Sequence, residues 1–283
     1  MSGVTNGIPD VISLVPDAPY SSRRFSNGRT WIEDFAAAVG LPQNARPAVA
    51  GALFGEDDGR ASNYAVGGRP RPISARASFL LSVQVNLFLS DVRGAPLPMR
   101  CTSSRSAATT FGLPLVAGPG VLGLALTSVA QNIQKLYGQE RDISWSGAPR
   151  RWTYPALQRL NTFVAPGIAA GATALSAGYN QNLQGVLQGL GAALPGITIV
   201  PFDAFGLLAD VQANPRRFGL INATTACIEP NVPQFGFPSS PPFRCAQQDR
   251  FFFWDGIHPT RAGHAIIAIE VGKTLIGAVL HDL

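Results

Sequence analysis

Two of the three histidines of this chain lie within seven residues, in the stretch FFFWDGIHPTRAGH at positions 251 to 264. Asp255 precedes His258 by three residues, so its carboxylate can reach the nearer ring nitrogen of the imidazole. That hydrogen bond would fix the tautomer of His258 and support the imidazolium that forms when the ring takes a proton. The other ring nitrogen would then be available as a general base toward a hydroxyl nucleophile.

Other interpretations of the same residues stay open. A histidine in a loop can simply cap a helix or fill a polar gap, and Asp255, His258 and His264 could bind a metal, although three ligands are few for a closed zinc site. In the catalytic interpretation, His264 is structural. The aromatic run from Phe251 to Trp254 is then expected to form the apolar approach that excludes water.

The elements that must position these residues alternate between helices and short buried strands. Strands are expected at 62–72 and at the start of 196–208, and helices are expected at 29–41, 76–92, 121–138, 167–194 and 259–280. This alternation favours a parallel sheet that is covered on both faces, with ligands at the carboxyl ends of the strands. Since no repeat or linker interrupts the pattern, we expect residues 1–283 to form one domain.

The composition excludes several function classes. Hydrophobic residues make up 46% and charged residues 14% of the chain, which suits a folded domain with a sizeable core. The net charge is +5, but lysine occurs only at Lys135 and Lys273 and the arginines are scattered, so no nucleic-acid partner is expected. No apolar run approaches the ~18 residues of a transmembrane helix.

The cysteines bear on the compartment of the protein. Cys227 and Cys245 bracket the proline-rich loop CIEPNVPQFGFPSSPPFRC, and a disulfide that closes this loop would suit an exported protein. Two free thiols are the alternative, and Cys101 is left over in either case. The opening MSGVTNGIPD lacks the charged and apolar regions of a signal peptide. The expectation is therefore a cytosolic protein, or a secreted one whose export signal is not in this sequence.

A family resemblance joins these observations. The block DGIHPTRAGH behind an aromatic strip resembles the C-terminal block of the GDSL lipases of the SGNH-hydrolase superfamily. Similar segments occur elsewhere in the family's chain order and are spread over more than half of the chain: APYSSRRFSNGRTWIEDFAAAVGLP at 18–42, NYAVGG at 63–68, SAGYNQNL at 176–183, ITIVPFDAF at 197–205, and TTAC at 224–227, which Cys245 follows.

The resemblance implies a flavodoxin-like three-layer α/β/α sandwich with a parallel sheet, possibly lacking its first strand. It also implies a secreted, monomeric carboxylic-ester hydrolase without metal or cofactor, acting on a small-molecule or lipid ester. Acyl transfer would use a serine nucleophile, with His258 as base, Asp255 orienting it, and the amide of Gly68 as an oxyanion donor. The alternative is an inactive family member that binds an acyl or glycan ligand.

The chain departs from the family pattern in two blocks. The Gly-Asp-Ser-Leu block, which supplies the nucleophile, should precede PYSSRRFSNG, yet it is absent, and Ser2 lies in no suitable context. The Gly-x-Asn-Asp block, which supplies an oxyanion-hole asparagine, should lie between the helices expected at 76–92 and 121–138. Segments 96–120 and 138–157 are instead polar where core strands are due, so we expect them to be the least ordered parts of the chain.

The genetic code offers an explanation for both polar segments. One set of synonymous codons encodes MRCTSSRSAATTFG (99–112), and the same bases read in a frame displaced by one base encode DALYVVEIGGNDVR. The displaced reading contains a β-branched strand followed by Gly-Gly-Asn-Asp. Likewise GQERDISWSGA (138–148) can read AGARYFLVWGA, and RRWTY (150–154) can read DVGLT. The hypothesis is a translation through compensating base slips, from a start codon internal to a longer gene.

Overall fold

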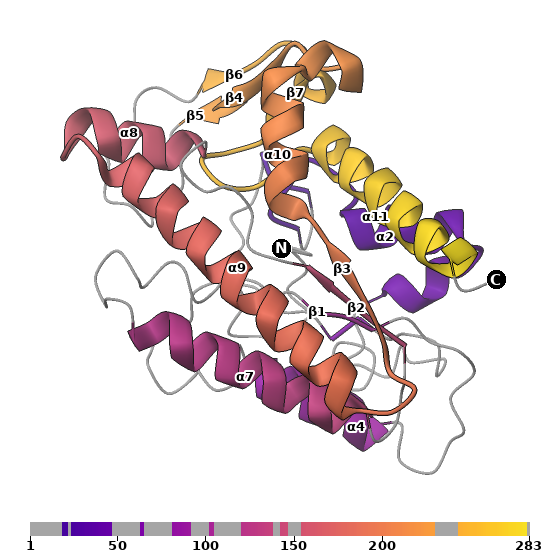
Figure 1. Ribbon diagram of the computed structural model, residues 1–283. Helices are drawn as coiled ribbons and strands as arrows, with labels where there is room; N and C mark the ends of the chain where they lie inside the picture. The colour runs from indigo at the N-terminus through magenta and orange to yellow at the C-terminus, as the bar shows by residue number, and fades with distance from the viewer. Residues whose placement is uncertain are drawn as a thin grey trace.

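The computed structural model describes residues 19–21, 24–46, 63–64, 81–91, 102–104, 120–137, 142–146, 154–229 and 243–281. Its centre is a parallel sheet with the order β1-β2-β3, formed by β1 (Thr102–Ser104), β2 (Asp142–Ser146) and β3 (Thr198–Phe202). Helices lie on both sides of these strands (Figure 1). The register pairs Thr102 with Ile143 and Ile143 with Ile199.

One face of the sheet is covered by α4 (Leu81–Asp91), α7 (Gly120–Tyr137) and α9 (Ile168–Ala193), which run side by side in Figure 1. Their buried residues recur every three or four positions, which places them on one side of each helix. These residues form one apolar cluster: Val85, Phe88, Ala125, Val129, Ile133, Leu136, Tyr179, Leu183, Leu187 and Leu190. Ile199 of β3 packs against this cluster.

The opposite face carries α2 (Trp31–Ala38), α10 (Ala204–Ala213) and α11 (Arg261–His281). Phe202 of β3 belongs to this second cluster, three positions from Ile199, because successive side chains of a strand alternate between the faces of the sheet. The two clusters and the sheet between them give three layers, so the predicted α/β/α fold with a parallel sheet is confirmed.

A second group of strands follows α10 and supports the region of the histidines. β4 (Asn222–Ala226) pairs in parallel with β7 (Phe251–Phe253), and β5 (Ile228–Glu229) pairs antiparallel with β6 (Phe243–Arg244). The predicted disulfide between Cys227 and Cys245 is present beside the second pair. The remaining described elements are α8 (Pro155–Phe163) and the 3₁₀ turns η1 (Pro42–Ala45), η4 (Pro215–Phe218) and η6 (Gln248–Arg250).

Five predicted helices coincide within a few residues with α2, α4, α7, α9 and α11. The strand expected at the start of 196–208 ends at Phe202, and α10 follows because the Asp203 side chain accepts a hydrogen bond from the Gly206 amide and caps the helix. Of the strand expected at 62–72, only Asn63 and Tyr64 are described. No described helix is long and apolar enough to cross a bilayer.

Within segments 96–120 and 138–157, which are expected to be the least ordered, two short stretches are strands of the central sheet, β1 and β2. The end of the second segment is also regular, since α8 starts at Pro155. Backbone pairing organises these short stretches, of β2 with β3 and of β1 with β2, although their letters, TSS and DISWS, are mostly polar. Most other residues of the two segments lie outside the described part of the chain.

Candidate active site

The turn between β7 and α11 carries Asp255 and His258. The Trp254 amide donates to the carbonyl of His258 at 2.7 Å, and the Thr260 amide donates to the carbonyl of Phe252 at 2.8 Å. The Thr260 hydroxyl also donates to the carbonyl of Phe251 at 2.6 Å. These three bonds fold the chain back on β7, so Asp255 and His258 are held on a rigid support.

Asp255 and His258 form the hydrogen bond that their spacing predicts. His258 Nδ1 lies 2.7 Å from Asp255 Oδ2, and the two side chains are 5% and 0% exposed, respectively. The other carboxylate oxygen, Oδ1, accepts the backbone amides of Ile257 at 2.8 Å and His258 at 2.7 Å. Within the described residues, His258 Nε2 has no hydrogen-bond partner.

The electrostatics of the pair favour an ionised carboxylate. Burial alone would raise the pKa of Asp255, but the charge of the neighbouring His258, the hydrogen bonds from His258 and Tyr20, and the Ile257 amide together lower the pKa below its ordinary value. An ionised Asp255 fixes a proton on Nδ1 and leaves Nε2 as the basic nitrogen of the ring. This arrangement can act as a general base.

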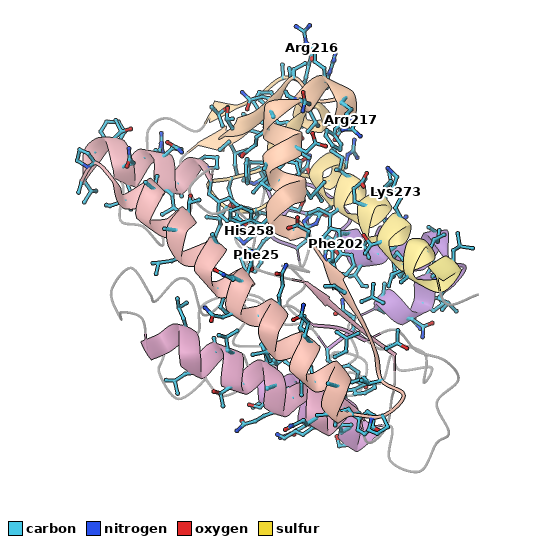
Figure 2. The ribbon with its side chains drawn as sticks, in the orientation of Figure 1. Phe25, Phe202, Arg216, Arg217, His258 and Lys273 are labelled. Atoms are coloured by element: carbon cyan, nitrogen blue, oxygen red, sulfur yellow. A yellow bond between two sulfur atoms is a disulfide. The ribbon has the colours of Figure 1, made fainter. Side chains whose placement is uncertain are left out.

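Two residues from the N-terminal part of the chain complete the surroundings of the pair. The ring of Phe25 stacks on the imidazole of His258 with a centroid distance of 4.9 Å and an interplanar angle of 15°, and Figure 2 shows the two side by side. The hydroxyl of Tyr20 donates to Asp255 Oδ2 at 2.6 Å. Neither residue is predicted from the sequence as part of the site, because more than 230 positions separate them from the turn and only the family-like segment at 18–42 points to them.

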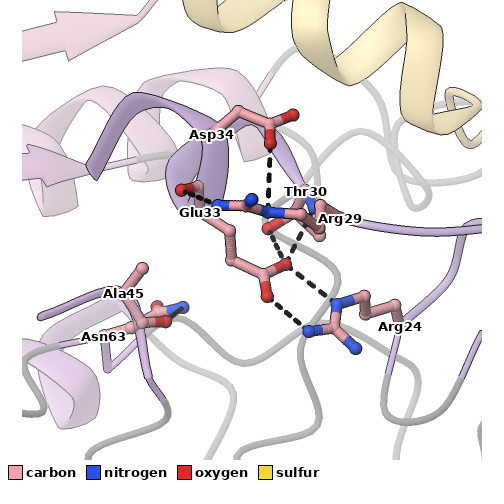
Figure 3. Close-up of polar contacts among 7 residues, drawn as sticks. All are labelled: Arg24, Arg29, Thr30, Glu33, Asp34, Ala45 and Asn63. Atoms are coloured by element: carbon pink, nitrogen blue, oxygen red, sulfur yellow. Dashed lines mark hydrogen bonds and ion pairs between the residues drawn. The ribbon is translucent and has the colours of Figure 1, made fainter. Parts of the chain in front are cut away.

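The segment that carries Phe25 is anchored on both sides. Ser26 Oγ donates to the carbonyl of Pro259 at 2.9 Å, and the Arg261 amide donates to Asn27 Oδ1 at 2.7 Å. On the other side, the Arg24 guanidinium binds both carboxylate oxygens of Glu33 (Figure 3).

Glu33 also organises the start of α2. Its Oε2 accepts the backbone amide of the N-cap residue Thr30 at 2.8 Å and the Thr30 hydroxyl at 2.9 Å (Figure 3). Partial burial alone would raise the pKa of Glu33, but the hydrogen bonds from Arg24 and Thr30 lower it. Residues 24–33 therefore form a fixed connection between α2 and the turn that carries His258.

The aromatic run before the turn has a different position from the one expected. Phe252 and Phe253 are buried in the second core cluster with α10 and α11, and Trp254 packs beside the disulfide of Cys227 and Cys245. These three residues form interior structure under the turn and not an apolar approach to it. The cause is the pairing of β7 with β4, which places the run inside the fold.

The other residues singled out in the sequence do not join the pair. His264 is buried on α11, where its amide donates to the carbonyl of Thr260. In the described ranges, no three histidine, cysteine or acidic residues are placed to share a metal ion, so the metal interpretation of Asp255, His258 and His264 finds no support. Gly68, Cys101 and Ser2 lie outside the described residues.

Comparison with known proteins identifies relatives of one kind. GDSL esterase/lipase 7 of Arabidopsis thaliana is 23% identical over 284 residues, which cover 89% of this chain and 78% of the relative. A second GDSL esterase/lipase of the same plant is 27% identical over 270 residues, or 88% of this chain and 76% of the relative. A third is 34% identical over only 93 residues. No protein-family model matches the chain.

Several other matches are partial. Three GDSL esterases/lipases of Arabidopsis thaliana match over 28%, 25% and 40% of their own lengths. Together with the two long matches, the three-layer fold and the Asp255–His258 pair in the expected block, they lead to one conclusion. Over most of its length the chain is similar to GDSL esterases/lipases.

Proposed function

We propose that this protein is a carboxylic-ester hydrolase that works by acyl transfer on a small-molecule or lipid ester. A serine hydroxyl attacks the acyl carbon while His258 Nε2 takes its proton, and the resulting imidazolium then protonates the leaving alkoxide. Water hydrolyses the acyl-enzyme by the same route. Asp255 holds the tautomer of His258 throughout, and the Gly68 amide is proposed, on the resemblance alone, to stabilise the oxyanion.

The buried Asp255–His258 hydrogen bond is the observation that carries this proposal. The carboxylate of Asp255 accepts Nδ1–H of His258 at 2.7 Å, and Nε2 has no partner in the described residues. A general base needs this arrangement. The family of the chain supports ester hydrolysis as the reaction. No described hydroxyl is hydrogen-bonded to His258, so the nucleophile is proposed to lie elsewhere.

The frame-slip hypothesis is part of the proposal, and the position of β1 and β2 supports it. β2 is the middle strand of a parallel sheet between two helical layers, where strands normally read as continuous apolar runs. Its letters are DISWS, and the displaced reading gives YFLVW at the same positions; β1 changes from TSS to YVV. The displaced reading also brings Gly-Gly-Asn-Asp just after β1, at a carboxyl end of the sheet.

A second function is favoured by the sequence as printed. No Gly-x-Asn-Asp block occurs between α4 and α7, so the alternative is a family member that binds an acyl or glycan ligand without turnover. Secretion is proposed as well, because the Cys227–Cys245 disulfide suits an oxidising compartment.

The test compares hydrolysis of p-nitrophenyl acetate and butyrate by four proteins. These are the chain as printed, its His258→Ala variant, a chain with the displaced readings and an upstream Gly-Asp-Ser block, and the His258→Ala variant of that chain. His281→Ala, at the end of α11, is the matched control. We expect activity only in the repaired chain, and a loss of at least about 10³-fold on His258→Ala. Activity of the repaired chain that survives His258→Ala would overturn the proposed mechanism.

A further inference from the structure

The phenol of Tyr20 ends on the carboxylate of Asp255. Although 235 positions separate the two residues, Tyr20 Oη lies 2.6 Å from Oδ2. This is the same oxygen that accepts His258 Nδ1 at 2.7 Å. Tyr20 therefore contacts the acid of the pair directly, at the oxygen that the imidazole also binds, while Oδ1 accepts the backbone amides of Ile257 and His258.

Tyr20 completes the hydrogen bonding of a buried charge. A carboxylate has about four acceptor positions, and Asp255 has four donors: the Tyr20 hydroxyl, the His258 ring, and the amides of Ile257 and His258. Asp255 is completely buried. Loss of one donor would leave an acceptor position of a buried anion unsatisfied, which weakens the orientation of the whole group.

The direction of the phenol is set by its neighbours. The Tyr20 ring meets Phe25 edge to face at 6.5 Å and Trp254 at 6.4 Å, with interplanar angles of 81° and 87°. Burial, followed by the negative charge of Asp255 and the hydrogen bond to it, raises the pKa of Tyr20 far above its ordinary value. The raised pKa favours the protonated hydroxyl, which is the form that donates to Asp255.

We propose that Tyr20 is a positioning residue for the Asp255–His258 pair. Its hydrogen bond fixes the rotation of the carboxylate about Cβ–Cγ, so that Oδ2 meets Nδ1 and Nε2 is held in one direction. The consequence for catalysis rests on the proposed ester hydrolysis, but the consequence for the geometry of the pair does not. The competing role is packing alone, in which the ring matters and the hydroxyl does not.

Tyr20→Phe separates the two roles because it removes the hydroxyl and keeps the ring. The measurement is the ¹H and ¹⁵N NMR spectrum of the full chain with labelled histidine, in which His258→Gln assigns the Nδ1–H signal. In Tyr20→Phe we expect this signal to shift and its exchange with solvent to accelerate about tenfold, the equivalent of about 1.4 kcal/mol, while the His264 signals stay in place. Tyr137→Phe is the matched control, because it removes a hydroxyl that donates to the exposed carbonyl of Pro195 at 2.8 Å.

The outcomes are distinct. An unchanged His258 signal in Tyr20→Phe overturns the proposal, and so does an equal change in Tyr137→Phe. If Tyr20→Phe does not fold, the ¹H NMR spectrum of the unmodified chain decides. A Tyr20 hydroxyl proton that is protected from exchange in the unmodified chain, and whose signal disappears in Asp255→Asn, supports the role. If the unmodified chain shows no protected Tyr20 hydroxyl proton, the proposal is overturned.

The activity measurement is separate. In a chain that hydrolyses p-nitrophenyl butyrate, Tyr20→Phe should lower kcat about tenfold and leave KM unchanged. If the NMR signature is present and no variant of the repaired chain has activity, the positioning role stands and the proposed function fails.

Discussion

Phe25 lies flat on the imidazole of His258, at a centroid distance of 4.9 Å, and is itself only 3% exposed. The contact joins the N-terminal segment to the turn before α11, and it covers one face of the ring that we propose as the base. A stacked aromatic face restricts rotation of the imidazole about its side-chain bonds and contributes about 0.5–1.5 kcal/mol beyond the burial of its area.

Phe25→Leu is therefore expected to lower the free energy of unfolding by about 1–2 kcal/mol. Urea denaturation followed by tryptophan fluorescence measures this change. Phe163→Leu is the control, since the side chain of Phe163 is 74% exposed and its loss should cost less than about 0.5 kcal/mol. Equal effects of the two substitutions would show that the stacking contributes nothing.

The ionised state of Asp255 predicts how stability changes with acid. Its folded pKa is lowered by His258 and its other donors despite burial, so its contribution is fully present above the unfolded value of about 3.9 and is lost as pH falls through the lower folded value. Asp255→Asn should cost about 1.5–3 kcal/mol at pH 7. Measured by urea denaturation, this difference should stay constant down to about pH 5 and shrink below about pH 4. A gap that widens with acid would contradict the assignment.

The contact between Asp255 and His258 could be predicted from the sequence, because the two residues are three positions apart and local spacing limits where their side chains can go. The positions of Tyr20 and Phe25 could not be predicted, since nothing local relates residues that far from the turn. The aromatic run Phe251–Trp254 was assigned to the wrong place for a similar reason. Whether a strand lies inside the fold depends on its partner, here β4.

Helix limits were predicted well where the apolar spacing of α7, α9 and α11 extends over several turns. The strands β1 and β2 were not expected in the letters TSS and DISWS, because intrinsic preference opposes them. Pairing within the sheet decides their conformation instead, because β2 pairs with the mostly apolar β3 and β1 pairs with β2.

The close approach of α11 to β7 gives a paired prediction. A Cβ on Gly263 would lie 2.6 Å from the carbonyl oxygen of Phe252 and 3.0 Å from Pro259 Cβ, so the backbone would have to move. Gly263→Ala should destabilise the protein by about 1–3 kcal/mol. Gly272→Ala, in the same helix with nothing within 4 Å of the added atom, should stabilise it by up to about 1 kcal/mol. Thermal unfolding monitored by circular dichroism tests both signs.

The disulfide is expected to stabilise the fold by closing the loop between Cys227 and Cys245. Cys227 and Cys245 are 18 positions apart, and a crosslink over a loop of this length contributes about 3 kcal/mol. The double substitution Cys227→Ala and Cys245→Ala should lower the free energy of unfolding by that amount, whereas Cys101→Ala should leave it unchanged. Peptide mapping without reductant should recover Cys227 linked to Cys245. Recovery of Cys101 in a bridge would refute the pairing.

The last prediction concerns the central strands and tests the frame-slip proposal without any substrate. Replacing residues 99–112 by DALYVVEIGGNDVR and 138–148 by AGARYFLVWGA puts apolar letters at β1 and β2. Each well-buried apolar side chain contributes about 1.5–3 kcal/mol, so two of them alone should raise Tm by on the order of 10 °C.

A control chain carries the same replacement letters in scrambled order, with glycine, alanine and polar residues at the strand positions. It has the same composition and length, so it separates strand packing from a general gain in hydrophobicity. By differential scanning calorimetry, the chain with the two replacements should have a higher Tm than the printed chain. The scrambled chain should have a Tm no higher than that of the printed chain. If the chain with the two replacements and the scrambled chain unfold at the same temperature, the displaced reading does not restore the interior of the sheet. The frame-slip explanation of the missing Gly-x-Asn-Asp block then fails as well.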